Sequence, residues 1–340
     1  MSPSQPRRTI DRLRVRIDHL ERLAFTRDHN FVVSQANEAF RSIHADAPAP
    51  ESILVRSDFI ARRKRIHVEG DRDRTPRPKP PIARLIRSHG LALRLELALL
   101  FLRQCTARPG AKIRLPVSAV DQGPESLGLI NLFATGTRQR PGSNYKRPRP
   151  AMRAKQVMHA LDILATPDMQ LVELGPTDAG RTGFHTMWLN DETGVTSTKD
   201  ASRYKVPTAE PVIPVPVEFF TNGWINVLTD SEIWNWLVWR HRANMTTAGG
   251  TSAPDLQLDA SDRLGIYDLT RDAWDTHQLL SSVGLMVTTP GEITSTSTTR
   301  GQRFRKEPHL FKLDDKELGK DAHHAVLSAV AALLDDLLSP

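Results

Sequence analysis

The spacing of apolar and polar positions is most informative between residues 259 and 289. Apolar residues recur there every three or four positions, which predicts a helix over 270–283 capped at its start by Thr270. A shorter helix over 262–266 precedes it, with Ser261 as the expected cap. Gly284 can adopt the left-handed conformation that ends a helix, and the apolar run after it predicts a short strand.

The helix expected over 270–283 has two different faces. Its apolar positions fall on one arc of the helical wheel and predict packing against a core. The opposite arc carries Arg271 and Gln278, and Arg271 is placed to pair with Asp275 one turn later. The polar face can therefore contact another molecule, although its own carboxylates disfavour contact with phosphate.

A β-ribbon is expected after this helix. Residues 288–299 are rich in Thr and Ser, and a strand returning over 303–313 would begin with Arg303 and Arg305. This order resembles the winged helix-turn-helix superfamily, whose usual helix-to-strand signature reads here Leu280-Ser281-Ser282-Val283-Gly284-Leu285-Met286. The resemblance covers roughly a third of the chain and implies a DNA-recognition helix followed by a wing.

The first half of the chain predicts the same order of elements. An apolar helix over 82–105 is followed by a strand over 112–117, a short helix over 126–133, a basic loop, a helix starting near Ala151, and two strands over 171–174 and 184–189. In the helix after Ala151, the expected buried arc comprises Ala154, Val157, Met158, Leu161 and Leu164. The outward face carries Lys155, Gln156 and His159, with Arg153 at its margin. Lys and Gln can read guanine and adenine edges, but ordinary exposed helices carry them too.

The predicted fold is therefore mainly α with small β wings. It consists of two tandem winged-helix domains plus N-terminal and C-terminal helices. The expected division is 1–81 for the N-terminal helix and a basic Pro-rich linker, 82–190 for the first domain with its basic loop, 191–217 for a Pro-rich linker, 218–313 for the second domain, and 314–340 for the C-terminal helix. Within the second domain, Thr229 and Glu232 stand at capping-box spacing, and Trp224, Trp234, Trp236 and Trp239 are expected in the core.

Each terminal helix leaves two interpretations open. The seam from Ile10 to Ala24 has heptad spacing and can dimerise or pack on its own chain. The apolar stripe of the C-terminal helix can form a symmetric subunit contact or cover the second domain. The basic run from Ala61 to Arg65 lies in the expected linker and is either solvated charge or an arm that contacts phosphates.

The net charge of +7 is unevenly distributed, because the first half is basic and the second half acidic. Between residues 138 and 155 there is no acid, and the cations are Arg138, Arg140, Lys146, Arg147, Arg149, Arg153 and Lys155. Such a cluster favours a polyanion, whose bound counterions are released on contact. The expected DNA-binding residues are these seven with Gln156, His159, Arg271, Gln278, Arg303 and Arg305.

Other chemistry finds little support in the sequence. Phosphate-binding loops of the GxxxxGK[ST] type, GxGxxG, HExxH and GxSxG motifs are absent, so no enzyme activity, cofactor or metal is expected. The single Cys105 cannot form an internal disulfide, and the longest apolar run, 97–102, is too short to cross a bilayer. We therefore expect a cytoplasmic, nucleoid-associated protein.

The expected function is binding of double-stranded DNA, in the first place as a sequence-specific transcriptional regulator. A replication initiator of plasmid or mobile-element type is the alternative, because its paired winged-helix domains resemble the predicted arrangement. An architectural or scaffold protein is a third reading, since the acidic second half can serve a protein partner. A homodimer through either terminal helix is compatible with all three.

Overall fold

A computed structural model of the chain describes residues 5–24, 32–45, 50–68, 78–88, 90–106, 128–134, 149–175, 183–194, 201–247, 256–289, 293–298, 301–306 and 310–339. These residues are mostly helical, and their strands form antiparallel sheets of two strands each. The coarse expectation of a mainly α fold with small β elements is therefore confirmed. None of the described helices is both long and apolar enough to cross a membrane.

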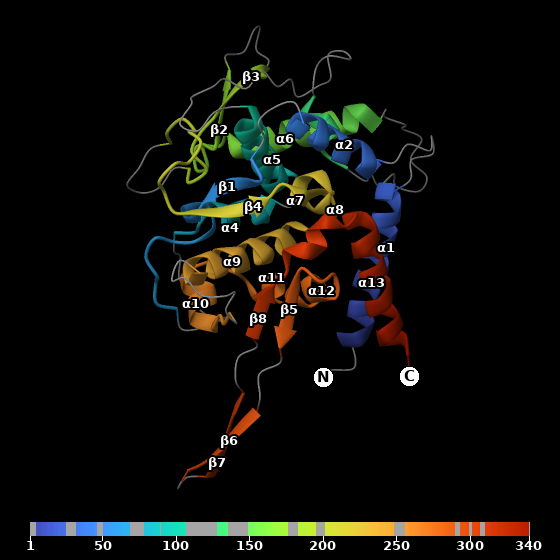
Figure 1. Cartoon of the computed structure of the whole chain (residues 1–340), viewed down its shortest axis with the longest axis vertical. Helices are drawn as coiled ribbons and strands as arrows, with labels where there is room; N and C mark the ends of the chain where they lie inside the picture. Colours follow the sequence, from blue (N-terminus) through green and yellow to red (C-terminus); the bar gives the residue numbers. More distant parts are fainter. Residues whose placement is uncertain are drawn as a thin grey trace.

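The middle of the molecule contains a sheet that joins two distant stretches of chain (Figure 1). Strand β1 (Ser52–Arg56) pairs with β4 (Val212–Pro216), with Ser52 opposite Pro216 and Arg56 opposite Val212. Alternate residues of both strands are buried. The first expected linker was interrupted by one short element around Ile53 to Ile66, and β1 lies at its start. The linker expected over 191–217 contains β4, because alternate burial favours a strand even in this Pro-rich segment.

Helix α9 (Asp230–Thr247) lies directly below this sheet in Figure 1 and is buried on all sides through residues 232–241. It is preceded by α7 (Glu218–Thr221) and α8 (Trp224–Val227). The expected capping box is present: the Thr229 N–H donates to Glu232 Oε2 at 2.6 Å, and the Glu232 N–H donates to Thr229 Oγ1 at 3.3 Å. All four tryptophans expected in the core are buried there.

The upper part of the molecule in Figure 1 is built around α5 (Ala92–Thr106), which is also buried over most of its length. Its other described elements are α2 (Val32–Ala45), α4 (Pro81–Leu85), the 3-10 turns Ile86–Ser88 and Leu129–Leu132, α6 (Arg149–Leu164), and the hairpin of β2 (Val172–Gly175) with β3 (Gly183–Leu189). The helix expected over 82–105 is thus interrupted between α4 and α5. The strand expected over 112–117 lies outside the described residues.

The lower part contains α10 (Ala260–Gly265), α11 (Arg271–Trp274), α12 (His277–Ser282) and the pair β5 (Met286–Thr289) with β8 (Leu310–Leu313). Two predictions are wrong in detail. Asp259, rather than Ser261, caps α10 by accepting from the Asp262 N–H, because the helix begins two residues earlier than expected. The single helix expected over 270–283 is divided into α11 and α12, although Thr270 caps its start as expected.

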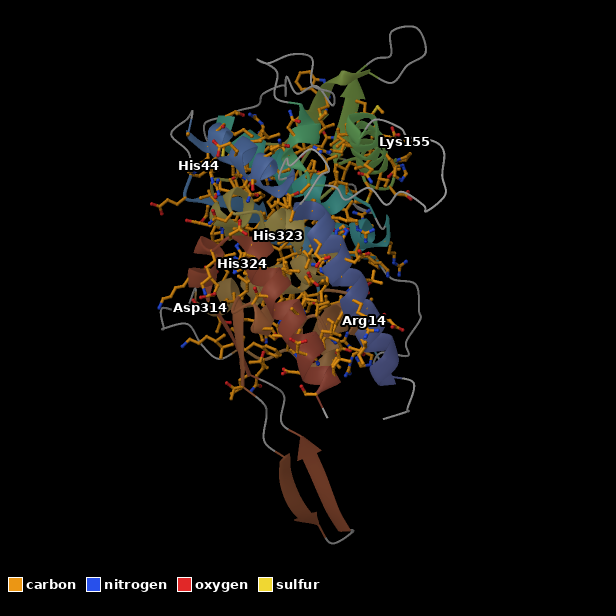
Figure 2. The ribbon with its side chains drawn as sticks, turned by 90° about the vertical axis from the view of Figure 1, so that its right-hand side faces the viewer. Arg14, His44, Lys155, Asp314, His323 and His324 are labelled. Carbon is orange, nitrogen blue, oxygen red and sulfur yellow. The ribbon has the colours of Figure 1, made fainter. Side chains whose placement is uncertain are left out.

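The terminal helices α1 (Gln5–Ala24) and α13 (Ala322–Leu338) lie side by side along one flank of the molecule (Figures 1 and 2). Leu20 and Leu23 of α1 are buried together with Val326 and Val330 of α13. His323 Nε2 lies 2.8 Å from the Leu20 carbonyl oxygen. Both helices therefore pack on their own chain, which was one of the two interpretations left open for each.

A buried ion pair ties the stretch after β3 to β1. The Arg56 guanidinium donates to Glu192 Oε2 at 2.5 Å, and the Arg56 N–H donates to Glu192 Oε1 at 2.9 Å. The side chains of these residues are 8% and 0% exposed. A third contact joins Arg56 to the Lys205 carbonyl oxygen at 2.8 Å, so one guanidinium holds segments far apart in sequence.

We predict that Arg56→Met destabilises the protein by about 3–5 kcal/mol, because it leaves the Glu192 carboxylate buried without a cation. Urea denaturation of the variant and the parent chain measures the change in free energy of unfolding. Arg271→Ala is the control, because that exposed ion pair should contribute less than about 1 kcal/mol. Equal losses in the two variants would contradict the assignment.

Glu96 of α5 is a buried carboxyl group without a hydrogen-bond partner among the described residues. Burial raises the pKa of Glu96 well above its usual value, and the charges of Glu192 and Asp191 raise it further. The folded chain therefore retains a proton that the unfolded chain releases above about pH 4.3. This group consequently lowers the free energy of unfolding as the pH rises from that value toward its folded pKa.

We predict that Glu96→Gln becomes more stable relative to the parent chain as the pH is raised, because glutamine has no proton to lose. Urea denaturation at about pH 5 and about pH 8 measures the two differences in free energy of unfolding. The difference should shift in favour of the variant at the higher pH. A constant difference would show that Glu96 titrates normally in the folded chain.

Candidate nucleic-acid interface

Helix α6 presents the outward face that the sequence predicts. Ala154, Val157, Leu161 and Leu164 are buried, and Met158 is half-buried. On the other side Lys155, Gln156 and His159 are exposed, with Arg153 half-buried at the margin. Lys155 stands out from the surface at the upper end of the molecule in Figure 2. This exposure is compatible with contact to a duplex.

The hairpin after α6 is held to it at its base. The Leu171 N–H donates to the Leu164 carbonyl oxygen at 2.9 Å, and the Asn190 side-chain amide donates to the Gln170 carbonyl oxygen at 2.9 Å. Gln170 itself has a positive φ of 47°. The tight turn fixes the direction in which β2 and β3 leave the helix, so helix and hairpin form one unit.

In the second half, α11 and α12 carry the other expected contact residues. Arg271 and Gln278 are exposed, and Arg271 Nε lies 3.0 Å from Asp275 Oδ1 as the sequence predicts. The side-chain amide of Asn235 donates to the Trp274 carbonyl oxygen at 3.0 Å and lies 3.1 Å from Thr276 Oγ1. These bonds from α9 satisfy groups at the break between α11 and α12, which is why one continuous helix does not form.

Gly284 ends α12 as expected, with a left-handed φ of +80°. A Cβ at this position would lie 2.8 Å from Glu317 Cγ, so close approach also favours glycine. Beyond it, β5 pairs with β8, and a bridge joins Phe311 of β8 to Leu256, which precedes α10. The result is a small sheet in which β8 lies between β5 and Leu256.

A second antiparallel ribbon extends the β5–β8 pair. Strands β6 (Ile293–Thr298) and β7 (Gly301–Lys306) project from the lower end of the molecule in Figure 1. The backbone register places Arg303 opposite Thr296 and Arg305 opposite Thr294. The ribbon expected after the second helix is therefore present, and the two arginines belong to its returning strand.

The expected DNA-binding residues do not gather at one place. Those of α6 lie in the upper part of Figure 1, whereas those of α11, α12 and β7 lie in the lower part. Arg138, Arg140, Lys146 and Arg147 lie outside the described residues, and Arg149 is described only as the first residue of α6. The described part of the interface thus has two separate surfaces.

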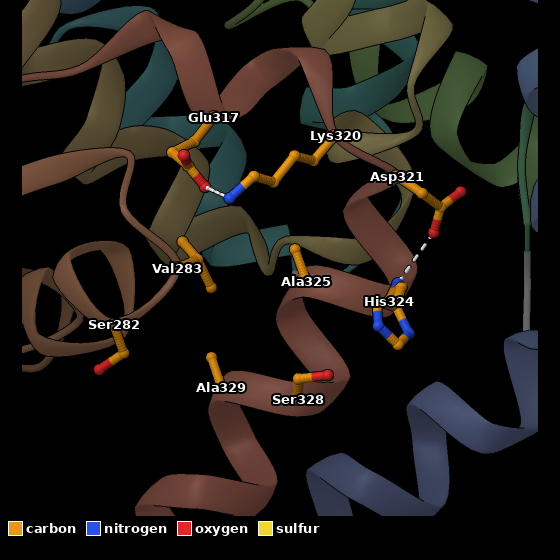
Figure 3. A pocket seen from close by; sticks show the side chains of 9 residues that line it. All are labelled: Ser282, Val283, Glu317, Lys320, Asp321, His324, Ala325, Ser328 and Ala329. Atoms are coloured by element: carbon orange, nitrogen blue, oxygen red, sulfur yellow. Dashed lines mark hydrogen bonds and ion pairs between the residues drawn. The ribbon is translucent and has the colours of Figure 1, made fainter.

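A shallow hollow of about 590 Å³ lies between α12 and α13 (Figure 3). Lys320 forms an ion pair with Glu317, and the Asp321 carboxylate caps α13 by accepting from the backbone N–H of His324. The remaining wall consists of small residues such as Ala325 and Ala329. In the described part of the chain, no cluster of three or more His, Cys, Asp or Glu side chains is arranged so that it could hold a metal ion.

The basic segment from Ala61 to Arg65, for which solvated charge and a phosphate-contacting arm were both left open, is held in part by its own chain. It was expected within a linker, but Arg62 donates to the Leu264 carbonyl oxygen at 2.6 Å and lies 2.8 Å from Asp268 Oδ1. The alternation of charge with apolar Ile60 and Ile66 was the available signal.

Comparison with protein-family models, curated proteins and solved structures finds no match for this chain.

Proposed function

We propose that this protein binds double-stranded DNA through two winged-helix modules. The observation that carries the proposal is the connectivity of the second half. Helix α9 is followed by the bridging residue Leu256, by α10, by α11 and α12, by β5, by the projecting ribbon, and by β8. If α11 and α12 count as one interrupted helix and Leu256 stands for a short first strand, this is the order expected of a winged helix. In such modules the second of the two short helices reads the major groove.

The first half supports a second module of the same kind. Helix α5, the 3-10 turn Leu129–Leu132, α6 and the β2–β3 hairpin follow one another in the same order. The face of α6 offers Lys155 and Gln156, which suit guanine and adenine edges. The acid-free loop before α6 supplies cations for the phosphate backbone. We assign base reading to α6 and phosphate contact to this loop.

Sequence-specific regulation of transcription is the use that we favour. The modules share one hydrophobic core, so their recognition elements have a fixed spacing and suit a site of defined length. The same fixed spacing of two modules also favours a second candidate function, that of a replication initiator that binds repeated DNA sites. The ion pair between Arg271 and Asp275 reduces the attraction of α11 for phosphate. This surface can therefore serve a protein contact instead.

Selection of the purified protein on a random duplex library at about 0.15 M salt tests the proposal, because unspecific phosphate binding is weak there. We expect one enriched motif, lost when Arg147, Arg149 and Lys155 are changed together to Ala. Arg271→Ala should leave nonspecific affinity nearly intact if α11 serves a protein contact instead of DNA. No enrichment, or unchanged binding by the triple variant, would contradict the proposal. Single inverted sites in the genome favour a regulator, and arrays favour an initiator.

The ribbon provides an independent test. If Arg303 and Arg305 each contact a phosphate, changing both to Ala should reduce the slope of log affinity against log salt concentration by about 2. Fluorescence anisotropy with one selected duplex over a range of salt concentrations measures the slope. Thr294→Ala and Thr296→Ala in the opposite strand are the matched control and should leave the slope unchanged. A slope equal to that of the parent chain would exclude the ribbon from the interface.

A further inference from the structure

A cavity of about 740 Å³ lies where the first half of the chain meets the second. Its walls come from α3 (Ser57–Ile60) with the loop after it, from residues between 191 and 211, and from α9 with the end of α10. This volume lies within the range of roughly 300–1,000 Å³ typical of small-molecule sites. The cavity is distinct from both surfaces assigned to DNA.

The rim of the cavity has an excess of positive charge among the described residues. The side chains of Arg63, Arg65 and Arg242 are 72%, 53% and 35% exposed. Arg63 contacts Asp58, whereas Asp262 is shared by Arg65 at 3.0 Å and Arg242 at 3.7 Å. Three guanidinium groups thus share two carboxylates. Because exposed ion pairs contribute little to stability, an anionic ligand can replace these contacts.

Two further arginines line the cavity but are occupied in holding the fold. Arg56 is fixed by Glu192 and by the Lys205 carbonyl oxygen. Arg62 donates to the carbonyl oxygens of Pro78 and Leu264, both at 2.6 Å. The rim cations are therefore attached to a rigid wall, which lowers the entropic cost of binding a ligand.

The cavity is also lined by uncharged residues, which we call its floor. It includes Ala61, Ile266 and Tyr267, and His241 Nδ1 lies 2.9 Å from the Tyr267 hydroxyl oxygen. Burial lowers the pKa of His241 to about 4, with a smaller contribution from Arg242, so the imidazole is neutral at pH 7. An apolar, partly aromatic floor suits the uncharged portion of a ligand whose anionic group lies at the rim.

Carboxylates line another part of the same cavity. Asp191 and Glu210 both contribute to the wall and lie near Arg56, at 3.8 Å and 3.5 Å. Asp191, 13% exposed, already accepts from the N–H and hydroxyl of Thr193. Glu210 accepts from backbone N–H groups of the preceding turn, but its side chain is 50% exposed, so its carboxylate remains accessible to a ligand. Carboxylates accept hydrogen bonds from hydroxyl and amino groups and repel phosphate. A ligand that fits all three parts has a phosphate group, an uncharged body, and hydroxyl or amino groups.

We propose that this cavity binds a small phosphorylated ligand of the nucleotide class. Arg63, Arg65 and Arg242 hold the phosphates, and Asp191 and Glu210 accept hydrogen bonds from the sugar or base. The phosphate backbone of a duplex fits only the rim, because it offers nothing to the floor and is repelled by the carboxylates. Since the walls come from both halves of the chain, a bound ligand stabilises their arrangement.

Isothermal titration of the full chain with ADP, GDP and pyrophosphate tests the proposal, with adenosine as the phosphate-free control. We expect saturable binding of one nucleotide per chain, weaker binding of pyrophosphate, and none of adenosine. The double variant Arg63→Ala, Arg65→Ala should weaken nucleotide binding by at least about tenfold, equivalent to about 1.4 kcal/mol. Arg271→Ala, an exposed arginine on another surface, should leave it unchanged.

Three outcomes would overturn the site: no saturable nucleotide binding, equal binding by the double variant, or loss of duplex affinity in that variant without nucleotide binding by the parent chain. The last outcome would identify the rim as a DNA contact. Thermal unfolding of the variant verifies that it is folded, and Arg242→Gln provides a second test if it is not. Because titration requires no DNA, the result is separate from that of the proposed function.

Discussion

The burial of α9 on every face is the constraint on which both halves of the molecule depend. Trp236 stacks on Phe219 with ring centroids 4.7 Å apart, and Trp239 packs on Phe311 of β8 at 4.2 Å. Large aromatic side chains contribute much of the apolar surface that such a core removes from water. Because one helix supplies surface to the central sheet and to the lower module, neither can move without exposing it.

Charge is divided between the interior and the surface according to how it is paired. Inside, Arg56 with Glu192 holds the stretch after β3 against β1, and this contact shapes one wall of the cavity. At the surface, Arg65 and Arg242 share Asp262, and Lys155 of α6 is exposed. The buried pair fixes the positions of the segments that it joins, because removing either partner would leave the other as an unpaired buried charge. The exposed cations remain available to anionic ligands.

The proposed recognition elements lie at separated parts of the molecule, and this arrangement determines how they could act together. Helix α6 lies in the upper part in Figure 1, and the ribbon of β6 and β7 projects from the lower end. The cavity lies between them and takes residues from both halves. A ligand bound there can change DNA affinity only by interacting differently with the bound and free arrangements of these halves.

The sequence alone determined those features of the fold that depend on interactions between residues close together in the chain. Thr229 with Glu232, Thr270 and Gly284 mark helix ends through bonds or backbone angles set within a few residues, and the apolar arc of α6 follows from helical spacing. Only the tertiary structure decided that β1 pairs with β4, that Asn235 satisfies the break before α12, and that Arg63, Arg65 and Arg242 meet at one cavity. Those contacts join residues far apart in the chain, and hydrophobic periodicity records which face of an element is buried without recording what covers it.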